Sequence, residues 1–334
     1  MALAVYWYDF VCFAIVGGAI IGSLWVLRQK EGAGKRDNDT KYESLLVHGS
    51  DGNEFLGLTR SGHVSSSQLW MSCWNGVHPE CLLATRLVSA FIMAGFLAWD
   101  IFHYHSSIFI YYTEWTFTLT IAYFVLGTLV SVHGCRVYSN LPIENEDESD
   151  LEESRYTSIT LRTNKIRAAI KLESCLVQEE IERRAGFWGY LMQTVYQTCA
   201  GAVMLTDIVF WCLIVPFLSI EHFKLNLLMG CMHTLNAVFL LFDTALNSMP
   251  FPWFRLAYFV LWSCIYVIFQ WILHACGYSL WPYPFIELST PWAPLWYFCL
   301  SLVHIPCYGL YALVVKVKNS IFPRLFPHAY RRSY

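Results

Sequence analysis

The chain has 334 residues, of which 56% are hydrophobic and 17% aromatic, while only 14% are charged. With a mean hydropathy of +0.41, this composition exceeds what the core of a soluble protein of this length requires, so an ordinary soluble domain is excluded. The net charge of -3 is small, and charges of both signs are concentrated in the loops, so no nucleic-acid partner is expected.

Seven apolar stretches are long enough to cross roughly 30 Å of hydrocarbon at about 1.5 Å per helical residue. In chain order they cover residues 5–27, 82–104, 114–138, 189–217, 225–246, 255–278 and 293–316. The first stretch is interpreted as a retained anchor rather than a signal peptide, because it is long and Lys and Arg follow it instead of preceding it. The sequence therefore predicts an all-α, polytopic transmembrane helix bundle of about seven helices.

The predicted organisation begins with an N-terminal transmembrane anchor (1–27) and a flexible cytosolic segment (28–81). A six-helix membrane core (82–316) and a cytosolic tail (317–334) follow. The flexible segment contains Gly-rich and Ser-rich pieces. Its aromatic end, with Trp70 and Trp74, is expected at the level of the lipid headgroups. Cys73, His78 and Cys81 lack a fourth ligand and the paired spacing of a structural zinc site, so neither a metal site nor a cofactor is expected.

The core contains one long loop, residues 139–187, which opens with seven carboxylates between Glu144 and Glu153. Apolar residues recur between the basic residues of its second half, so part of it could form an amphipathic helix at the inner membrane surface. A plain connector is favoured over an electrostatic tether or a regulatory site. Ser149 and Ser154 are candidate phosphorylation sites in the acidic run.

The distribution of Lys and Arg predicts the orientation, because short basic loops stay in the cytosol. Of the 22 Lys and Arg residues, all except Lys224 lie in segments that the seven spans place on one side. The N-terminus is therefore expected outside or in a lumen and the C-terminus in the cytosol, at the plasma membrane or an endomembrane. Most of the 12 cysteines fall inside the predicted helices, so no disulfide framework is expected.

His233 is an imidazole inside an apolar run, residues 225–241. Ionisable groups at membrane depth are costly and usually face the interior of the bundle, which makes this residue a functional candidate. It lies about 13 Å along the helix axis from the outer end of the fifth predicted helix, at about 1.5 Å per residue. The alternative role is an interhelical hydrogen bond that holds the helices together.

Other polar groups gather near the same outer end of the bundle. Thr113 begins the third predicted helix, and His274 lies near the end of the sixth, before the aromatic stretch from Trp281 to Phe285. A single cavity would bring these residues together with His233. The alternatives are a helix-capping role for Thr113 and a position at the membrane interface for His274 and the aromatic stretch.

Three motifs in the core share their order and spacing with a known family. They are Tyr112-Thr113-Glu114-Trp115 continuing to Ala122-Tyr123-Phe124, then Met232-His233-Thr234, then His274 followed by Trp281-Pro282-Tyr283-Pro284-Phe285-Ile286-Glu287. In these motifs the chain resembles the androgen-induced-gene and rolling-stone-like membrane proteins. The resemblance covers residues 82–316 and leaves the first helix and the segment after it as additions.

Some members of that family are atypical threonine hydrolases that cleave fatty-acid esters of hydroxy fatty acids with an intramembrane Thr and His. The resemblance implies Thr113 as nucleophile, His233 as base, and membrane lipids or lipid esters as partners. Thr116, three residues further along, is an alternative match for the nucleophile. Other members, of the rolling-stone type, are linked to cell fusion and development rather than to a defined reaction, so membership alone does not establish catalysis.

The implied chemistry is coherent for these residue types. A Thr hydroxyl becomes nucleophilic when a neighbouring base takes its proton, and a desolvated imidazole favours the neutral form that accepts one. Asp207 is the candidate carboxylate for orienting His233, since both are predicted at similar depth, whereas Asp243 is expected too far toward the inner face.

His274, Trp281 and Tyr283 are candidate orienting or substrate-contact residues. Two functions are therefore predicted as alternatives. The first is an intramembrane lipid-ester hydrolase. The second is a non-catalytic multi-pass protein that acts in membrane organisation, signalling or cell fusion. A seven-helix receptor or transporter is less favoured, because the sequence has no midplane charge array or pair of broken helices that would mark an ion path.

Overall fold

The computed structural model describes residues 6–47, 65–140, 185–218 and 227–330, with side chains in the first range described through Glu31. In these ranges the chain forms helices and short turns, without a strand. The helices are α1 (Trp7–Val47), α2 (Ser66–Trp70), α3 (Pro79–Tyr104), α4 (Tyr112–Ser139), α6 (Phe187–Val209), α7 (Val215–Leu218), α8 (Leu227–Leu246), α9 (Leu256–Ala275) and α10 (Ala293–Leu325). The predicted all-α fold is confirmed.

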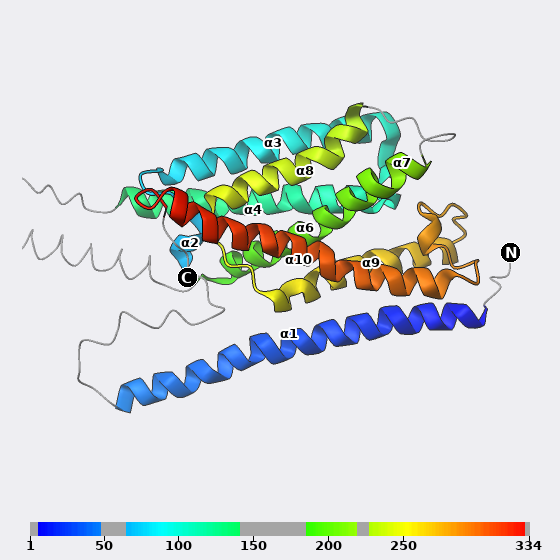
Figure 1. Cartoon of the computed structure of the whole chain (residues 1–334), viewed down its shortest axis with the longest axis horizontal. Coiled ribbons are helices and arrows are strands. Elements are labelled where there is room, and N and C mark those ends of the chain that lie inside the picture. Colours follow the sequence, from blue (N-terminus) through cyan, green and yellow to red (C-terminus); the bar gives the residue numbers. More distant parts are fainter. Residues whose placement is uncertain (1–5, 48–64, 141–184, 219–226, 331–334) are drawn as a thin grey trace, which may run out of the picture.

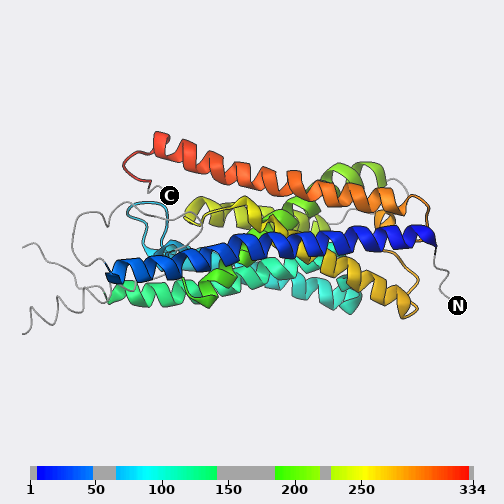
Figure 2. The same cartoon turned by 90° about the horizontal axis from the view of Figure 1, so that it is seen from below.

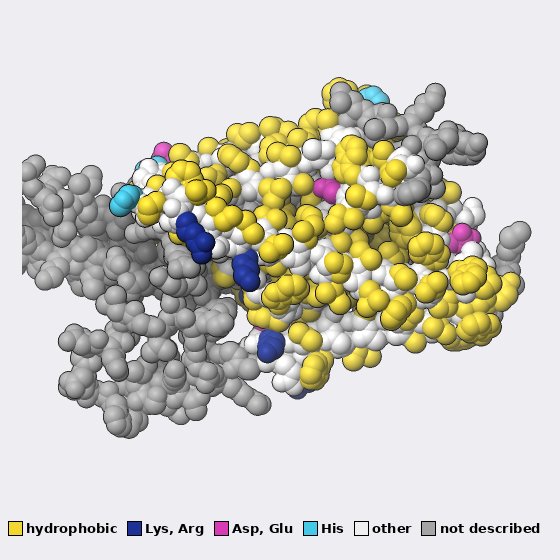
Figure 3. All heavy atoms as spheres, viewed as in Figure 1, with side chains coloured by type: hydrophobic (Ala, Val, Ile, Leu, Met, Phe, Trp, Pro, Cys, Tyr) yellow, Lys and Arg dark blue, Asp and Glu magenta, His cyan; other side chains and the backbone are white. Residues whose placement is uncertain are grey.

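Seven helical stretches of the described ranges are long and apolar enough to cross a membrane. They are Trp7–Glu31, Pro79–Ile110, Tyr112–Ser139, Phe187–Ile214, Leu228–Leu246, Trp253–Ala275 and Ala293–Leu325. Each corresponds to one of the seven predicted spans, and the chain has the architecture of a multi-pass membrane protein. Figure 3 shows one face of the bundle covered mainly by hydrophobic side chains, with Lys and Arg gathered toward one end.

The long helices run side by side, and α6 lies at the centre of the bundle (Figure 1), in contact with α4, α8, α9 and α10. Small residues let its neighbours approach closely. At Gly201 an added Cβ would meet the ring of Phe259 at 2.4 Å, so this position of α6 has no room for a larger residue. The span that contains α6 is accordingly the most buried of the seven.

Helix α1 lies along the outside of the bundle (Figure 2), where it packs on α9 and α10. Near its start, Cys12 and Val16 are buried against Tyr297. At the other end of the span Glu31 accepts a hydrogen bond from the Tyr258 hydroxyl at 2.8 Å and lies 3.7 Å from the guanidinium of Arg255. The additional first helix is therefore attached to the core at both ends of its span.

Residues 65–78, predicted as part of a flexible linker with an aromatic end at the headgroups, pack into the helix bundle. Trp70 is 1% exposed and occupies space left by Gly134 of α4, where a Cβ would lie 2.1 Å from the indole. Trp74 donates a hydrogen bond from its indole to the backbone oxygen of Ala245 and pairs with Tyr330. Trp70 is therefore buried between helices, while its predicted depth at the lipid headgroups stays a prediction.

A buried ion pair joins this segment to the core. The Arg86 guanidinium on α3 donates to Asp243 on α8 at 2.8 Å, and both side chains are almost fully buried. A second nitrogen of Arg86 donates to the backbone oxygen of Leu69 at 2.7 Å, at the end of α2. Tyr123 and Asn247 also donate to Asp243, so the carboxylate has partners on three sides.

The helical boundaries differ from the predicted ones where polar residues extend the helices. Helix α1 continues through Val47 into the predicted flexible segment, and α10 continues to Leu325 into the predicted tail. In α10 the ammonium of Lys318 is buried and donates to the backbone oxygens of Thr244 and Asn247 at the end of α8. The acidic run, the amphipathic helix and the two candidate phosphorylation sites predicted for the loop at 139–187 lie outside the described residues.

Candidate active site

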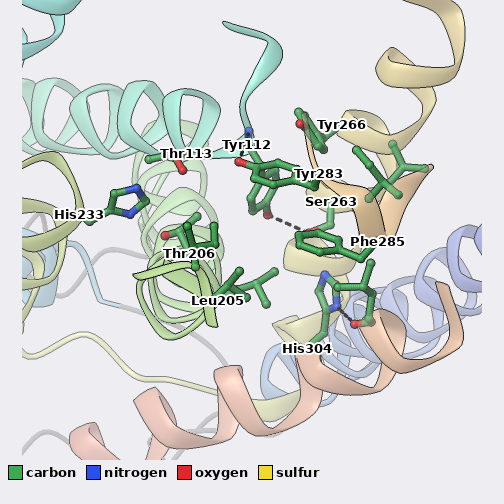
Figure 4. A pocket seen from close by; sticks show the side chains of 15 residues that line it. Tyr112, Thr113, Leu205, Thr206, His233, Ser263, Tyr266, Tyr283, Phe285 and His304 are labelled. Atoms are coloured by element: carbon green, nitrogen blue, oxygen red, sulfur yellow. Dashed lines mark hydrogen bonds between the residues drawn. The ribbon is translucent and has the colours of Figure 1, made fainter. Parts of the chain in front are cut away.

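A cavity of about 100 Å³ lies between α4, α6, α8, α9, α10 and the loop that connects α9 to α10. Its surface is mostly apolar, and a few polar groups converge on it (Figure 4). The polar side chains along its wall are those of Tyr112, Thr113, Thr206, His233, Ser263, Tyr266, Tyr283 and His304. Apolar surroundings with few convergent polar groups are typical of a small-molecule site.

Thr113 lies at the second position of α4 and is 9% exposed. The N-cap of this helix is Tyr111, which has an extended backbone and provides no side-chain cap. The Thr113 hydroxyl is therefore not the capping group that the alternative interpretation requires. It points toward the space between His233 and Tyr283 (Figure 4). Thr116, the alternative nucleophile, is fully buried in α4 and does not line the cavity.

His233 of α8 lines the same cavity and is 6% exposed. Its ring lies flat on Phe210, with ring centroids 3.6 Å apart and planes 8° apart. Its Nδ1 is 3.8 Å from a carboxylate oxygen of Asp207 on α6. This separation is too long for a hydrogen bond, and both atoms are buried without a hydrogen-bond partner among the described residues. The three predicted residues Thr113, His233 and Asp207 thus come together from α4, α8 and α6.

A widened turn brings Phe210 under His233. Residues Phe210–Ile214 form a π-helical turn between α6 and α7. Pro216 follows it, and because proline has no backbone N–H it cannot donate to the carbonyl four residues before it, which favours such an irregularity. Single π-helical turns are frequent at functional sites. Here Val209 precedes the turn, Ile214 ends it, and both line the cavity.

Tyr283, in the loop between α9 and α10, closes the cavity above Thr113. Its hydroxyl oxygen accepts a hydrogen bond from the backbone N–H of Tyr112 at 3.2 Å. Burial raises the pKa of the Tyr283 phenol to about 12, while hydrogen bonding from Thr113 and from the backbone of Tyr112 acts in the opposite direction. The phenol therefore stays protonated at neutral pH and has a hydrogen to donate.

His304 of α10 lines the opposite end of the cavity, a residue that sequence reasoning missed. It is 7% exposed, its Nδ1 lies 2.7 Å from the backbone oxygen of Leu300, and its ring packs on Phe259. The sequence contained the signal that would have identified it, because His304, like His233, is an ionisable side chain in an apolar span. Beside it the hydroxyls of Tyr112 and Ser263 share a hydrogen bond of 2.8 Å.

Two predicted contact residues lie away from the cavity wall. His274 stacks on Trp281, with ring centroids 3.5 Å apart, and neither lines the cavity. The Nδ1 of His274 lies 2.8 Å from the backbone oxygen of Gln270, which holds the ring against α9. His274 and Trp281 are therefore not among the residues that line the cavity with His233, and their rings stack on each other at the end of α9.

Thr113 and His233 line one cavity, and Asp207 lies near the imidazole, so the residue types used in nucleophilic catalysis occur in one region. Thr113 and His233 are not hydrogen-bonded to each other among the contacts of the described residues. Tyr283 lies on the other side of Thr113, and its hydroxyl oxygen accepts from the Tyr112 N–H at the start of α4, which lacks an intrahelical partner. Within the described ranges no three His, Cys, Asp or Glu side chains form a group suited to a metal ion.

Comparisons with protein-family models, with curated proteins and with solved structures found no match to this chain. The site is therefore characterised by its own geometry. Helices α4 and α8 bring Thr113 and His233 to one cavity, α6 adds Asp207 behind the imidazole, and the α9–α10 loop adds Tyr283.

Proposed function

We propose that the chain is an intramembrane lipid-ester hydrolase with Thr113 as nucleophile and His233 as general base. The observation that carries this proposal is that both residues, far apart in the sequence, line one cavity. The reaction class comes from the resemblance to the androgen-induced-gene and rolling-stone-like proteins, and the cavity supports it independently. The substrate class is fatty-acid esters of hydroxy fatty acids or related lipid esters.

In the proposed reaction His233 takes the proton of the Thr113 hydroxyl while the oxygen attacks the ester carbonyl. The carbonyl carbon becomes tetrahedral, its bond to the alcohol oxygen breaks, and the imidazolium returns the proton to the leaving alcohol. Water then attacks the acyl-threonine as His233 takes a proton from it. The carboxylic acid leaves, and the proton goes back to the Thr113 oxygen.

The negative charge that develops on the ester oxygen needs hydrogen-bond donors. The protonated phenol of Tyr283 lies on the Thr113 side of the cavity and can donate to this oxygen. Catalytic hydrogen bonds are often long before substrate binds and tighten in the complex. The proposal therefore requires Thr113 and His233 to approach each other when an ester occupies the cavity.

The position of the cavity suits a substrate that arrives from lipid. It lies among membrane-spanning helices, near the end of the bundle where α1 begins, and its lining is largely apolar. The Lys and Arg side chains gather toward the opposite end (Figure 3), which supports a cytosolic location for that end and a lumenal or external location for the cavity. A lipid ester would enter and its two amphiphilic products would leave laterally.

Covalent labelling of Thr113 tests the proposal directly. Purified protein in detergent is incubated with a fluorophosphonate that carries an alkyl chain, and the modified residue is identified by mass spectrometry. We expect the phosphonyl group on Thr113, with labelling prevented in His233→Ala because the hydroxyl loses its base. Labelling confined to another hydroxyl, or none together with no hydrolysis of several lipid esters, would favour the non-catalytic membrane protein.

Replacing Asp207 with asparagine is expected to lower kcat by up to about 10⁴-fold, the effect of losing the carboxylate that orients the imidazole in a Ser-His-Asp triad. KM should change little, because Asp207 is behind His233 rather than on the cavity wall. Steady-state kinetics on a lipid ester, with kcat and KM determined separately, provides the measurement. An unchanged kcat would remove Asp207 from the proposed mechanism.

A further inference from the structure

The end of the cavity away from Thr113 has its own polar groups, and all but one are satisfied. The hydroxyls of Tyr112 and Ser263 share a hydrogen bond there. The exception is the Nε2 of His304, which is buried and has no hydrogen-bond partner among the described residues. A buried polar atom without a partner is costly, so a bound group that satisfies it would gain affinity.

Whether Nε2 donates or accepts a hydrogen bond follows from the contact of the other ring nitrogen, Nδ1. A backbone oxygen can only accept, so the Nδ1 that faces Leu300 carries the hydrogen of the neutral imidazole. The Nε2 of His304 is then an acceptor. Figure 4 shows the ring in the cavity below Phe285 and Ser263, with Nδ1 bonded to the backbone.

The surroundings of His304 favour a neutral ligand group. No Lys or Arg side chain lines the cavity in the part of the chain that the structure describes, so a carboxylate or phosphate placed there would lack a counterion. An acceptor nitrogen surrounded by apolar side chains such as Leu205 and Ile286 selects a ligand that donates a hydrogen bond without charge. A hydroxyl is the common lipid group with that property.

We propose that His304 is a specificity-determining residue that accepts a hydrogen bond from a free hydroxyl of the lipid in this cavity. The ligand class is a lipid alcohol such as a partial acylglycerol. This inference rests on the proposed function in one respect, namely that the cavity is the lipid site. It adds that the preferred substrate is one of the related lipid esters that carry an unesterified hydroxyl, because a fatty-acid ester of a hydroxy fatty acid offers a carboxylate and no free hydroxyl.

Binding measured without turnover tests the inference separately from hydrolysis. The Thr113→Ala protein in detergent is titrated with monododecyl glyceryl ether, which has free hydroxyls, and with its dimethyl ether, which has none. We expect the hydroxyl compound to bind about fivefold tighter, the value of one neutral hydrogen bond. The preference should vanish in the additional variant His304→Phe, which retains an aromatic ring against Phe259 but has no acceptor.

His274→Phe is the matched control. His274 has the same bond from Nδ1 to a backbone oxygen four residues earlier, but it lies outside the cavity wall, so the preference should remain. The dimethyl ether checks folding, because it should bind equally well with or without the His304 imidazole. If His304→Phe binds neither compound, His304→Gln, which keeps an acceptor oxygen, is measured in its place and should retain the preference.

Three results would overturn the inference. They are an equal affinity for the two ethers, a preference that survives in His304→Phe, and tighter binding of dodecanoate than of the glyceryl ether, which would indicate a charged ring that selects anions. None of these results depends on whether Thr113 is a nucleophile, since its hydroxyl is absent throughout. Failure of this inference is therefore distinguishable from failure of the proposed hydrolase.

Discussion

Replacing Thr113 with alanine is expected to lower kcat for lipid-ester hydrolysis by about 10⁴-fold or more, as removal of a catalytic nucleophile does in other acyl-transfer enzymes. The hydroxyl oxygen is the atom that forms the covalent intermediate in the proposed reaction, and alanine has none. His233→Ala should lose a similar factor, because residues that act as one unit have non-additive effects. Product release is measured by mass spectrometry at matched amounts of folded protein.

Two control variants separate this effect from damage to the fold. Thr118→Ala removes a hydroxyl from an exposed position of the same helix, and His103→Ala removes an exposed imidazole near the same end of the bundle. Both should keep the activity of the parent protein. Activity that survives Thr113→Ala but is lost in Thr116→Ala would move the nucleophile one turn along α4 and contradict the assignment made from the cavity.

Replacing Arg86 with alanine is expected to destabilise the protein by about 3–5 kcal/mol, the usual cost of removing one partner of a buried ion pair. The loss leaves the Asp243 carboxylate buried without its cation, and it also removes the donor to the backbone of Leu69. The packing of residues 65–78 against α3 and α4 should weaken together with global stability. Unfolding by denaturant in mixed micelles measures the free energy, and proteolysis measures release of the segment.

Arg136→Ala provides the comparison, since Arg136 is an exposed residue at the same end of the bundle and its loss should change stability by less than about 0.5 kcal/mol. Replacing the pair together, Arg86→Met with Asp243→Leu, should recover only part of the loss, because it removes both buried charges but leaves Tyr123 and Asn247 without their acceptor. If Arg86→Ala were as stable as Arg136→Ala, the buried pair would not hold the segment in place.

The positions of the spans could be predicted because apolar length is a local property of the sequence. A continuous run of about 20 apolar residues has to be helical in lipid, whatever its neighbours are. The predicted limits for the fourth core segment, 225–246, agree closely with Leu227–Leu246. The ends of α1 and α10 were predicted too short, because polar residues continue a helix beyond the membrane without any apolar signal.

The similar depth of His233 and Asp207 could also be predicted from the sequence, because depth follows from distance along a helix axis at about 1.5 Å per residue. Their mutual contact could not be predicted, because it depends on how α6 and α8 are rotated about their axes. His304, like His233, is a buried imidazole in an apolar span. Only its position on the cavity wall distinguishes it from a histidine that merely packs between helices. The burial of Trp70 could not be predicted, because it depends on the space beside Gly134, which is distant in the sequence.

By itself, then, the sequence determined an all-α membrane protein with seven spans and set the depth of its polar groups, because hydrophobic length and helical rise act along one dimension. Tertiary structure decided which of those groups meet. It joined Thr113, His233 and Asp207 across three helices, kept His274 and Trp281 outside the cavity, and brought His304 into it. The physical reason is that convergence depends on helix rotation and on side-chain packing between distant segments, and both are settled only when the helices pack together.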